Sequence, residues 1–342
     1  MITSDFESKL VEGIQPIRQF VLASSIHHLF SSGIYDVLRS RKSCVNGISD
    51  EIGLDKARVY GFLMYLVNEN ILAQEDELFE LSERGKDLEQ FRAWYTMLVG
   101  GYGGTFLEIG DKLKSGSGVA RREIVSVGVG SCGISHYDAF PLTKKLIQKM
   151  SSPPATICDM GCGNGMYLIE FCEYFAGIKT IGIEPNESSC LVAREYIASR
   201  NMSDRVEIIC ADAAEWVTRP SENKPDLFIL GFVLHEIMGQ RGREEVVRFL
   251  STIRKSCPKS AIAVIEVDDQ IATPGIMQHG LAKAYYNPYY LLHYFTNQKL
   301  LTPSEWESIF HDAGYAVTAK DTTSLNVDST GLEVGYLLTA LT

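Results

Sequence analysis

The sequence predicts an α/β fold, with a mostly parallel sheet of seven strands covered by helices and a helical region before it. Two observations predict it. From about residue 155 onward, short apolar runs alternate with helical patterns, which is typical of a parallel sheet with helices on both faces. Between about residues 10 and 90, apolar residues instead recur at helical spacing. Strands are expected near residues 156–160, 179–183, 205–209, 225–230, 260–266, 315–320 and 334–341.

The chain of 342 residues is long enough for two domains joined by a bridge. The patterns indicate a helical domain over residues 1–90, bridging helices with a substrate lid over residues 91–150, and the sheet domain over residues 151–342. The bridge contains the stretch "VSVGVGSCGISHYDAF". Its glycines imply that the backbone runs close to another group, as a lid over a ligand does.

The helical domain ends in the order helix, helix, small hairpin, which is a winged-helix order and suggests DNA binding. Residues 45–90 carry four basic side chains against eleven acidic ones, however. A surface that follows phosphates needs the opposite balance. We therefore expect this winged-helix domain to form a homodimer interface or a substrate lid.

Composition points to a small-molecule partner. The net charge of −11 argues against nucleic acid and anionic membranes, since both are polyanions that basic side chains must meet. The N-terminal "MITSDFESKLVEG" carries acidic residues where a signal peptide carries positive charge, so a cytoplasmic protein is expected. The eight cysteines show no paired CxxC spacing and are expected to be mostly buried thiols.

A glycine-rich turn follows the first strand of the sheet. In "ICDMGCGNGMYLIEF", Asp159, Gly161 and Gly163 precede a helix, and such glycines let backbone approach a ligand at the helix N-terminus. Asp159 would repel a pyrophosphate but suits a cofactor that carries an ammonium group. Glu184 ends the second strand, where a carboxylate can hold ribose hydroxyls, and Asp212 follows the third, where it can accept from an adenine amino group.

These acids at the carboxyl ends of successive strands resemble the S-adenosylmethionine site of the class I methyltransferases, over about residues 140–342. In that family the loop glycines approach the methionine part, the second acid binds ribose and the third binds adenine. The resemblance implies a Rossmann-like domain that binds S-adenosyl-L-methionine through six residues. They are Asp159, Gly161, Gly163, Glu184, Asp212 and Ala213.

His235 follows the fourth strand, "FILGFVL", and ligands of α/β sheets bind at the carboxyl ends of strands. In the plant-type O-methyltransferases a His-Asp pair stands there, and its histidine deprotonates a phenol. The pair His235-Glu236 is similar, but the continuation "HEIMGQRGREE" departs from that family's pattern. An O-methyltransferase that uses His235 as general base, without a metal, is therefore the alternative function.

Further stretches resemble the 2-oxo acid C-methyltransferases across nearly the whole chain: "GIQPIRQFVLASSIHHLFSSGIYD", "WYTMLVGGYGG", "VGVGSCGIS" and "YYLLHYFTNQKLLTPSEW". In that family two histidines bind a metal that chelates the keto acid, and a basic bridge residue meets its carboxylate. The resemblance implies metal ligation by His235 and His293. It implies methylation of the β-carbon of 2-ketoarginine or a phenylpyruvate-like acid through its enolate, which a Lewis acid stabilises.

Several assignments stay open at this level. His279 is the rival of His293, and either Arg121 or Arg122 can meet the carboxylate, with Arg122 preferred. Glu236 is expected to support the ligands or to act as a base. Imidazole ligation admits iron or zinc. A protein of a different functional class, a ligand-sensing regulator without enzymatic activity, is the other hypothesis. The acidic helical domain and the complete set of cofactor residues both argue against it.

Overall fold

The computed structural model describes residues 5–219 and 224–341. The chain divides into two compact units, the first ending at Gly101 and the second beginning at Tyr102. The division falls inside the segment 91–150 that the sequence marks as a bridge. Each unit has its own hydrophobic core.

The first unit is helical with one β-hairpin. Its helices are α1 (Asp5–Gly13), α2 (Gln15–Ser31), α3 (Ile34–Ser40), α4 (Val45–Ile52), α5 (Lys56–Asn68), α6 (Glu83–Asp87) and α7 (Arg92–Trp94), with a 3₁₀ turn, η1 (Leu88–Phe91), and a π-helical segment, η2 (Tyr95–Gly101). Helix α4 ends at Gly53 in the left-handed conformation, and the Asp55 carboxylate then caps α5 by accepting from the Arg58 amide. The antiparallel strands β1 (Leu72–Glu75) and β2 (Leu78–Leu81) follow, in the predicted order of helix, helix and hairpin.

The second unit contains the sheet. Its strands are β3 (Thr156–Met160), β4 (Lys179–Glu184), β5 (Val206–Cys210), β6 (Leu227–Gly231), β7 (Ala261–Val267), β8 (Tyr315–Thr322) and β9 (Glu333–Ala340). Each lies within two residues of its expected span. Its helices are α8 (Gly103–Lys112), α9 (Ile124–Ser135), α10 (Ala139–Gln148), α11 (Met166–Tyr174), α12 (Glu187–Ser199), α13 (Ala213–Thr218), α14 (Leu234–Arg241), α15 (Arg243–Ser256), α16 (Pro274–Met277), α17 (Asn287–Phe295) and α18 (Pro303–Asp312), with the π-helical η3 (Ala282–Tyr286).

The predicted seven-stranded, mostly parallel sheet is confirmed. Its strand order is β5-β4-β3-β6-β7-β9-β8, and only β9 and β8 run antiparallel to their neighbours. The chain starts at β3, moves outward to β5 and then returns to β6, so the strand order reverses between β3 and β6. In open α/β sheets a ligand crevice forms at such a reversal, outside the carboxyl ends of the strands.

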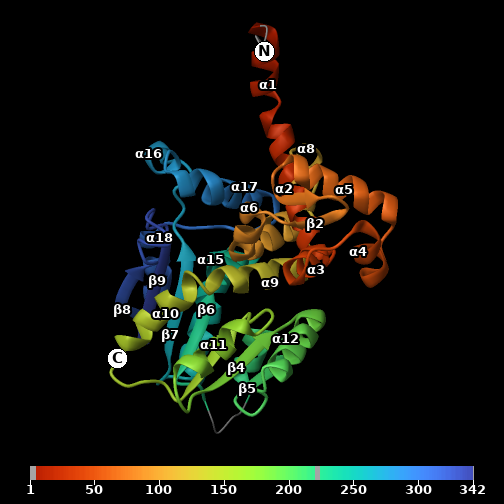
Figure 1. Cartoon of the computed structure of the whole chain (residues 1–342). Helices are drawn as coiled ribbons and strands as arrows, with labels where there is room; N and C mark the ends of the chain where they lie inside the picture. The colour runs from red at the N-terminus through yellow and green to blue at the C-terminus, as the bar shows by residue number, and fades with distance from the viewer. Residues whose placement is uncertain (1–4, 220–223, 342) are drawn as a thin grey trace. The chain divides into compact units, whose positions relative to one another are not determined.

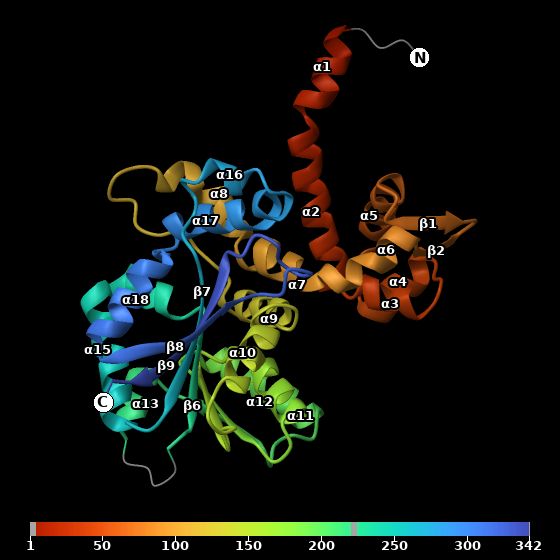
Figure 2. The same ribbon diagram turned by 90° about the vertical axis from the view of Figure 1, so that its left-hand side faces the viewer.

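Helices cover both faces of the sheet, as Figure 2 shows with α10, α11 and α12 on one side and α13, α15 and α18 on the other. Strand β6 contributes to both cores: Leu227 and Ile229 pack on the first side, and Phe228 and Leu230 on the second. Burial on both faces explains why this strand is apolar throughout. In Figures 1 and 2, β7 leads upward from the sheet to α16 and α17, which carries His293.

The described helices were also compared with the dimensions of a bilayer. Over residues 5–219 and 224–341, none combines the length and the apolar character that a membrane span requires.

Candidate active site

The glycine turn after β3 has the geometry of a ligand-binding loop. Gly161 and Gly163 have φ angles of 96° and 54°, which side-chain-bearing residues rarely adopt. A Cβ atom at Gly161 would lie 2.9 Å from Val233 Cγ2, and one at Gly163 would lie 3.2 Å from Cys132 Sγ. Helix α11 begins directly after this turn, so its free N–H groups point toward whatever the loop holds.

Two carboxyl groups border this loop. Glu184 accepts hydrogen bonds from the Gly163 amide at 3.2 Å and from the Asn186 amide at 2.9 Å. Asp159 is 5% exposed, and burial, with the charge of Glu184 second, raises its pKa to about 7. Burial raises the pKa of Glu184 as well. The loop therefore holds negative potential that a positively charged ligand would relieve.

Asp212 and Ala213 lie where β5 gives way to α13. The Asp212 carboxylate caps α13 by accepting from the Glu215 amide at 3.0 Å, and its side chain is exposed. Ala213 is the first residue of the helix and is half-buried. Asp159, Glu184 and Asp212 thus stand at or just after the carboxyl ends of three adjacent strands.

His235 is buried at the start of α14, just beyond the end of β6. Between strand and helix, Phe232 adopts a φ of 58°, an uncommon conformation for a side chain of that size. His235 Nδ1 lies 2.7 Å from Glu266 Oε2, and Glu266 Oε1 accepts from the backbone amides of Leu234 and His235. Burial by itself lowers the pKa of His235, but the charge and hydrogen bond of Glu266 outweigh it and raise that pKa.

His293 lies beside His235. The two rings have centroids 5.0 Å apart, and His293 is 3% exposed. Its Nδ1 lies 2.6 Å from the Tyr289 carbonyl oxygen, so Nδ1 carries the proton. Nε2 of His293 is buried and has no hydrogen-bond partner among the described residues. Burial, with the nearby His235, lowers the pKa of His293 well below its ordinary value, so the ring is neutral with a free lone pair on Nε2.

Arg122 and Glu236 form a two-bond ion pair next to these rings. Arg122 Nη1 and Nη2 donate to Glu236 Oε1 and Oε2 at 2.7 and 3.0 Å. Gln298 Nε2 donates to Glu236 Oε1 at 3.0 Å and lies 3.4 Å from His235 Nε2. Burial alone would raise the pKa of Glu236, but Arg122 outweighs it and lowers that pKa. Glu236 is therefore ionised and held firmly.

Arg121 and His279, the alternative candidates that the sequence left open for binding the carboxylate and the metal, lie outside this site. Arg121 is exposed and pairs with Glu108. His279 is exposed, with Nε2 3.0 Å from Ser329 Oγ and Nδ1 accepting from the Leu281 amide. The structure thus groups Arg122, Glu236, His235 and His293, and leaves Arg121 and His279 outside that group.

Comparison with known proteins identifies the family. Residues 135–320, more than half of the chain, match the Methyltransferase domain family. The chain is also 41% identical over 340 residues to the 2-ketoarginine methyltransferase of Streptomyces arginensis, an alignment that covers 98% of this chain and 97% of that protein. The chain belongs to the S-adenosylmethionine-dependent methyltransferases. The enzyme class and cofactor expected from the glycine turn and its acids are confirmed.

Solved methyltransferases share the fold. Human N-acetylserotonin methyltransferase in complex with S-adenosylmethionine superimposes with a TM-score of 0.70 at 15% identity, covering 100% of both chains. Mitomycin 7-O-methyltransferase superimposes with a TM-score of 0.64 at 18% identity, covering 97% of this chain and 98% of the other. At such identities these structures establish the fold only, and they confirm the predicted fold class of this methyltransferase.

Three supporting residues of the site were not predicted from the sequence. Glu266 stands in a strand that otherwise reads as core, although an acid inside the buried run "AIAVIEV" is itself a cue, because an unpaired buried charge is costly. Tyr289 contributes only its carbonyl oxygen, and Gln298 follows the end of α17. Among the described residues, no group of three or more His, Cys, Asp or Glu side chains is arranged to hold a metal ion.

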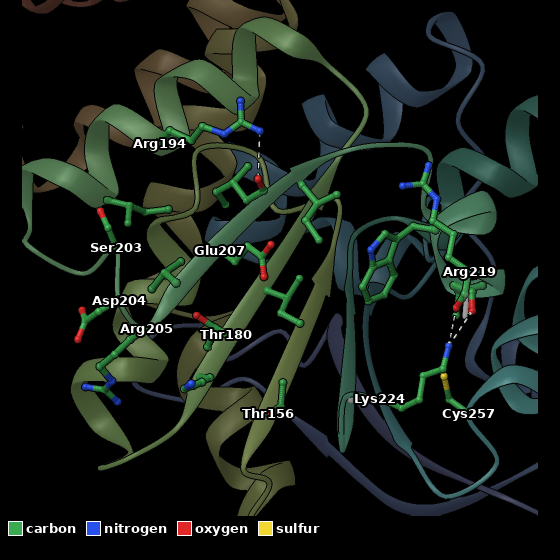
Figure 3. Close-up of a pocket in the computed structure, with 18 residues that line it drawn as sticks. Thr156, Thr180, Arg194, Ser203, Asp204, Arg205, Glu207, Arg219, Lys224 and Cys257 are labelled. Carbon is green, nitrogen blue, oxygen red and sulfur yellow. Dashed lines mark hydrogen bonds between the residues drawn. The ribbon is translucent and has the colours of Figure 1, made fainter. Parts of the chain in front are cut away.

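A separate hollow of about 840 Å³ opens at the other end of the strands (Figure 3). Thr156 and Lys179, the first residues of β3 and β4, line it. Several of its basic side chains already bind backbone oxygens: Arg194 that of Ile208 at 3.1 Å, and Lys224 that of Arg219 at 3.0 Å. Because α/β sheets bind ligands at the carboxyl ends of their strands, this hollow is separate from the active site.

Proposed function

We propose that this enzyme transfers a methyl group from S-adenosylmethionine to the β-carbon of a 2-oxo acid held on a metal ion by His235 and His293. The observation that carries the proposal is the pair of buried imidazoles, whose Nδ1 atoms are fixed by acceptors and whose Nε2 atoms lack a strong partner. The 41% identical relative named 2-ketoarginine methyltransferase supports the substrate class.

The cofactor would lie along the carboxyl ends of β3, β4 and β5. Gly161 and Gly163 would admit its methionine part, and Asp159 would face its positively charged groups. Glu184 would bind the ribose hydroxyls, with Asp212 and Ala213 at the adenine. Glu184 already binds the Gly163 amide, so ribose binding and the shape of the loop are coupled.

The histidine pair fits a metal by its donor set. Histidines that ligate metals through Nε2 usually donate Nδ1–H to a carboxylate or a backbone carbonyl, and Glu266 and the Tyr289 carbonyl are such acceptors here. Neutral imidazole suits iron or zinc. Bound by these nitrogens, such an ion would supply Lewis acidity that stabilises the enolate of a 2-oxo acid. Coordination positions beyond the two nitrogens would be left to substrate and water.

The chain's own groups would orient the reaction. Methyl transfer breaks the bond between sulfur and methyl, leaves that electron pair on sulfur, and forms a bond from the methyl to the β-carbon. The β-carbon becomes nucleophilic once its proton has passed to water and the C–H electron pair has moved toward the keto oxygen. The transfer is an in-line displacement, so positioning contributes most. Arg122 would share its guanidinium between Glu236 and the substrate carboxylate. Glu236, with its lowered pKa, is a weak base and would position Arg122.

We also propose a homodimer that forms through the first unit. Seven large apolar residues of the N-terminal segment are exposed: Phe6, Leu10, Val11, Ile14, Ile17, Phe20 and Val21. A row of this size along two consecutive helices is typical of a surface that another chain covers. Analytical ultracentrifugation at micromolar concentration is expected to give twice the chain mass, and Ile17→Glu with Phe20→Glu to give the monomer. A wild-type monomer would contradict the dimer.

The function is tested by measuring bound metal and methyl transfer on the same preparations. Wild-type protein should contain metal and methylate 2-ketoarginine or phenylpyruvate, and a chelator should abolish the activity. His235→Ala and His293→Ala should each lose metal, whereas His279→Ala, the matched control, should keep both metal and activity. Full metal content in a double variant at positions 235 and 293 would contradict the ligand assignment.

O-methyl transfer to a phenol is the second candidate, and the His235–Glu266 contact favours it. A histidine whose Nδ1 is held by a buried carboxylate is also the arrangement of a general base. If the enzyme is an O-methyltransferase, the rate of phenol methylation should be the same with and without chelator. His293→Ala would then leave most of the activity, because no metal would depend on it.

A further inference from the structure

A second group of ionisable side chains is buried near the histidine pair, and the proposed mechanism does not use it. Asp138 caps α10 by accepting from the Ala139 amide at 2.5 Å, and Glu333 begins β9 opposite Val267 of β7. They are 8% and 3% exposed, and each carboxyl group acts on the pKa of the other. Asp328, also buried, lies close enough for its charge to act on both.

This cluster has no internal cation. Within the described residues, neither Asp138 nor Glu333 forms an ion pair. Burial raises the pKa of Asp138 to about 7 and that of Glu333 well above its ordinary range, with Asp138 the next contributor to the latter. Folded proteins bury carboxylates with partners, so two buried carboxyl groups that act on each other without a cation are a costly arrangement that a cation would relieve.

A row of tyrosines connects the cluster with the histidines. The Tyr289 ring lies 4.1 Å from the His293 ring and 5.8 Å from the Tyr285 ring, measured between centroids. Burial, and after it the charges of Asp138 and Glu333, raise the pKa of Tyr285 well above its ordinary value. The Tyr286 ring lies 5.1 Å from the Tyr285 ring, and the Tyr286 hydroxyl donates to Asp328 Oδ2 at 2.6 Å, so the aromatic row extends from the acidic cluster to the proposed metal ligands.

The hydroxyl of Tyr289, in this row of tyrosines, has no hydrogen-bond partner among the described residues. Tyr289 is 7% exposed. Burial raises its pKa, and interactions with Tyr285, Glu266, Tyr102 and Glu333 contribute after it. A hydroxyl without a partner on a largely buried side chain is free to bind a ligand.

We propose that Asp138 and Glu333 bind the guanidinium at the far end of the substrate's side chain, and so select a cationic 2-oxo acid. The proposal rests on the proposed function, because the keto acid end must sit at His235 and His293. Two carboxylates match the planar donors of a guanidinium, and the rings of Tyr285 and Tyr289 would pack against the methylene groups between the two ends. The Tyr289 hydroxyl would accept from the guanidinium or from a water beside it.

The test compares 2-ketoarginine with the 2-oxo acid of citrulline, which has the same length but a neutral urea. Wild-type kcat/KM should favour 2-ketoarginine by about 100-fold. Asp138→Asn and Glu333→Gln should each remove most of that preference, mainly by raising KM for 2-ketoarginine, and should leave the citrulline analogue nearly unchanged. Asp321→Asn, which removes a surface carboxylate of β8, is the matched control and should behave as wild type.

The other outcomes are decisive as well. Equal use of both substrates by the wild type would overturn the proposal, and this comparison needs no variant to fold. Equal losses on both substrates would overturn it too, as would a raised Kd for S-adenosylmethionine in Asp138→Asn with unchanged substrate preference. If the wild type methylates no 2-oxo acid, the proposed function fails instead. Calorimetric binding of ethylguanidinium but not ethylurea, lost in Asp138→Asn, would still support the cationic subsite.

Discussion

At the scale of single residues, the candidate site depends on how two imidazole rings are held. Glu266 holds His235 through Nδ1 and also accepts hydrogen bonds from two backbone amides. One buried carboxylate therefore fixes both the orientation of the imidazole ring and the backbone at the start of α14. His235 and His293 could be proposed from the sequence, because one follows a strand end and the resemblance carries both. The contact of Glu266 with His235 and that of Arg122 with Glu236 could not be predicted, since those partners come from distant segments and no spacing rule connects them.

Glu266→Gln tests this role of the carboxylate. The amide keeps the shape of the side chain, but its NH₂ cannot accept from His235 Nδ1–H, so the imidazole should turn or change tautomer. We expect metal affinity to fall about 10- to 100-fold, and activity to fall with it. Metal titration followed by steady-state kinetics measures both. Glu207→Gln, at an exposed acid of β5, is the control, and unchanged metal affinity in Glu266→Gln would contradict the assignment.

Asp159 gives a pH-dependent prediction. Burial raises its pKa from an ordinary value of 3.8 to about 7 in the folded protein, so between about pH 4 and pH 7 the folded state binds a proton that the unfolded chain releases. Stability without cofactor therefore falls as the pH rises through that window. Asp159→Asn removes this effect, and its stability advantage over wild type should grow by on the order of 2 kcal/mol from pH 5 to pH 8.

Denaturant titrations of cofactor-free protein at the two pH values measure that advantage. Asp204→Asn, at an exposed aspartate, serves as the control. The same Asp159→Asn protein should bind S-adenosylmethionine more weakly, since it no longer offers a charge to the cofactor. A stability advantage that stays constant between pH 5 and pH 8 would contradict the prediction.

At the scale of elements, the sequence predicts which segments form strands but not which segments touch. All seven strands of the sheet lie within two residues of their expected spans, because buried parallel strands are apolar along their whole length. The packing of α14 against the chain after α17 has no such pattern. It rests on Gly239, where a Cβ atom would lie 2.3 Å from the Asn297 carbonyl oxygen and 2.6 Å from Gln298 Cα.

Gly239→Ala should therefore disturb the site from a distance. The added methyl group meets backbone atoms that cannot rotate away, so the segment that carries Gln298 must shift. We expect the free energy of unfolding to fall by about 1–3 kcal/mol, and activity to fall as well. Gly110→Ala in α8, where a Cβ meets nothing within 4 Å, should be neutral or slightly stabilising. Thermal unfolding of the two variants side by side checks the contrast, and equal behaviour would contradict it.

At the scale of the whole molecule, composition and topology together indicate a small-molecule enzyme. The net charge of −11 argues against a polyanion partner, and the strand order reverses between β3 and β6, where open α/β sheets bind ligands. The sequence could not give the division of the chain at Gly101 and Tyr102, because helical spacing continues across it. Nor could it give the buried pair of Asp138 and Glu333, which become neighbours only when β9 joins the sheet.

The central claim is methylation at carbon, and the position of the transferred group tests it most directly. Wild-type enzyme is incubated with 2-ketoarginine and S-adenosylmethionine labelled with ¹³C in the transferred methyl group, and the product is examined by NMR. The account predicts a labelled methyl on the β-carbon, coupled to a single remaining β-hydrogen, and no product after metal removal. A labelled methoxy signal, or undiminished activity after metal removal, would contradict it.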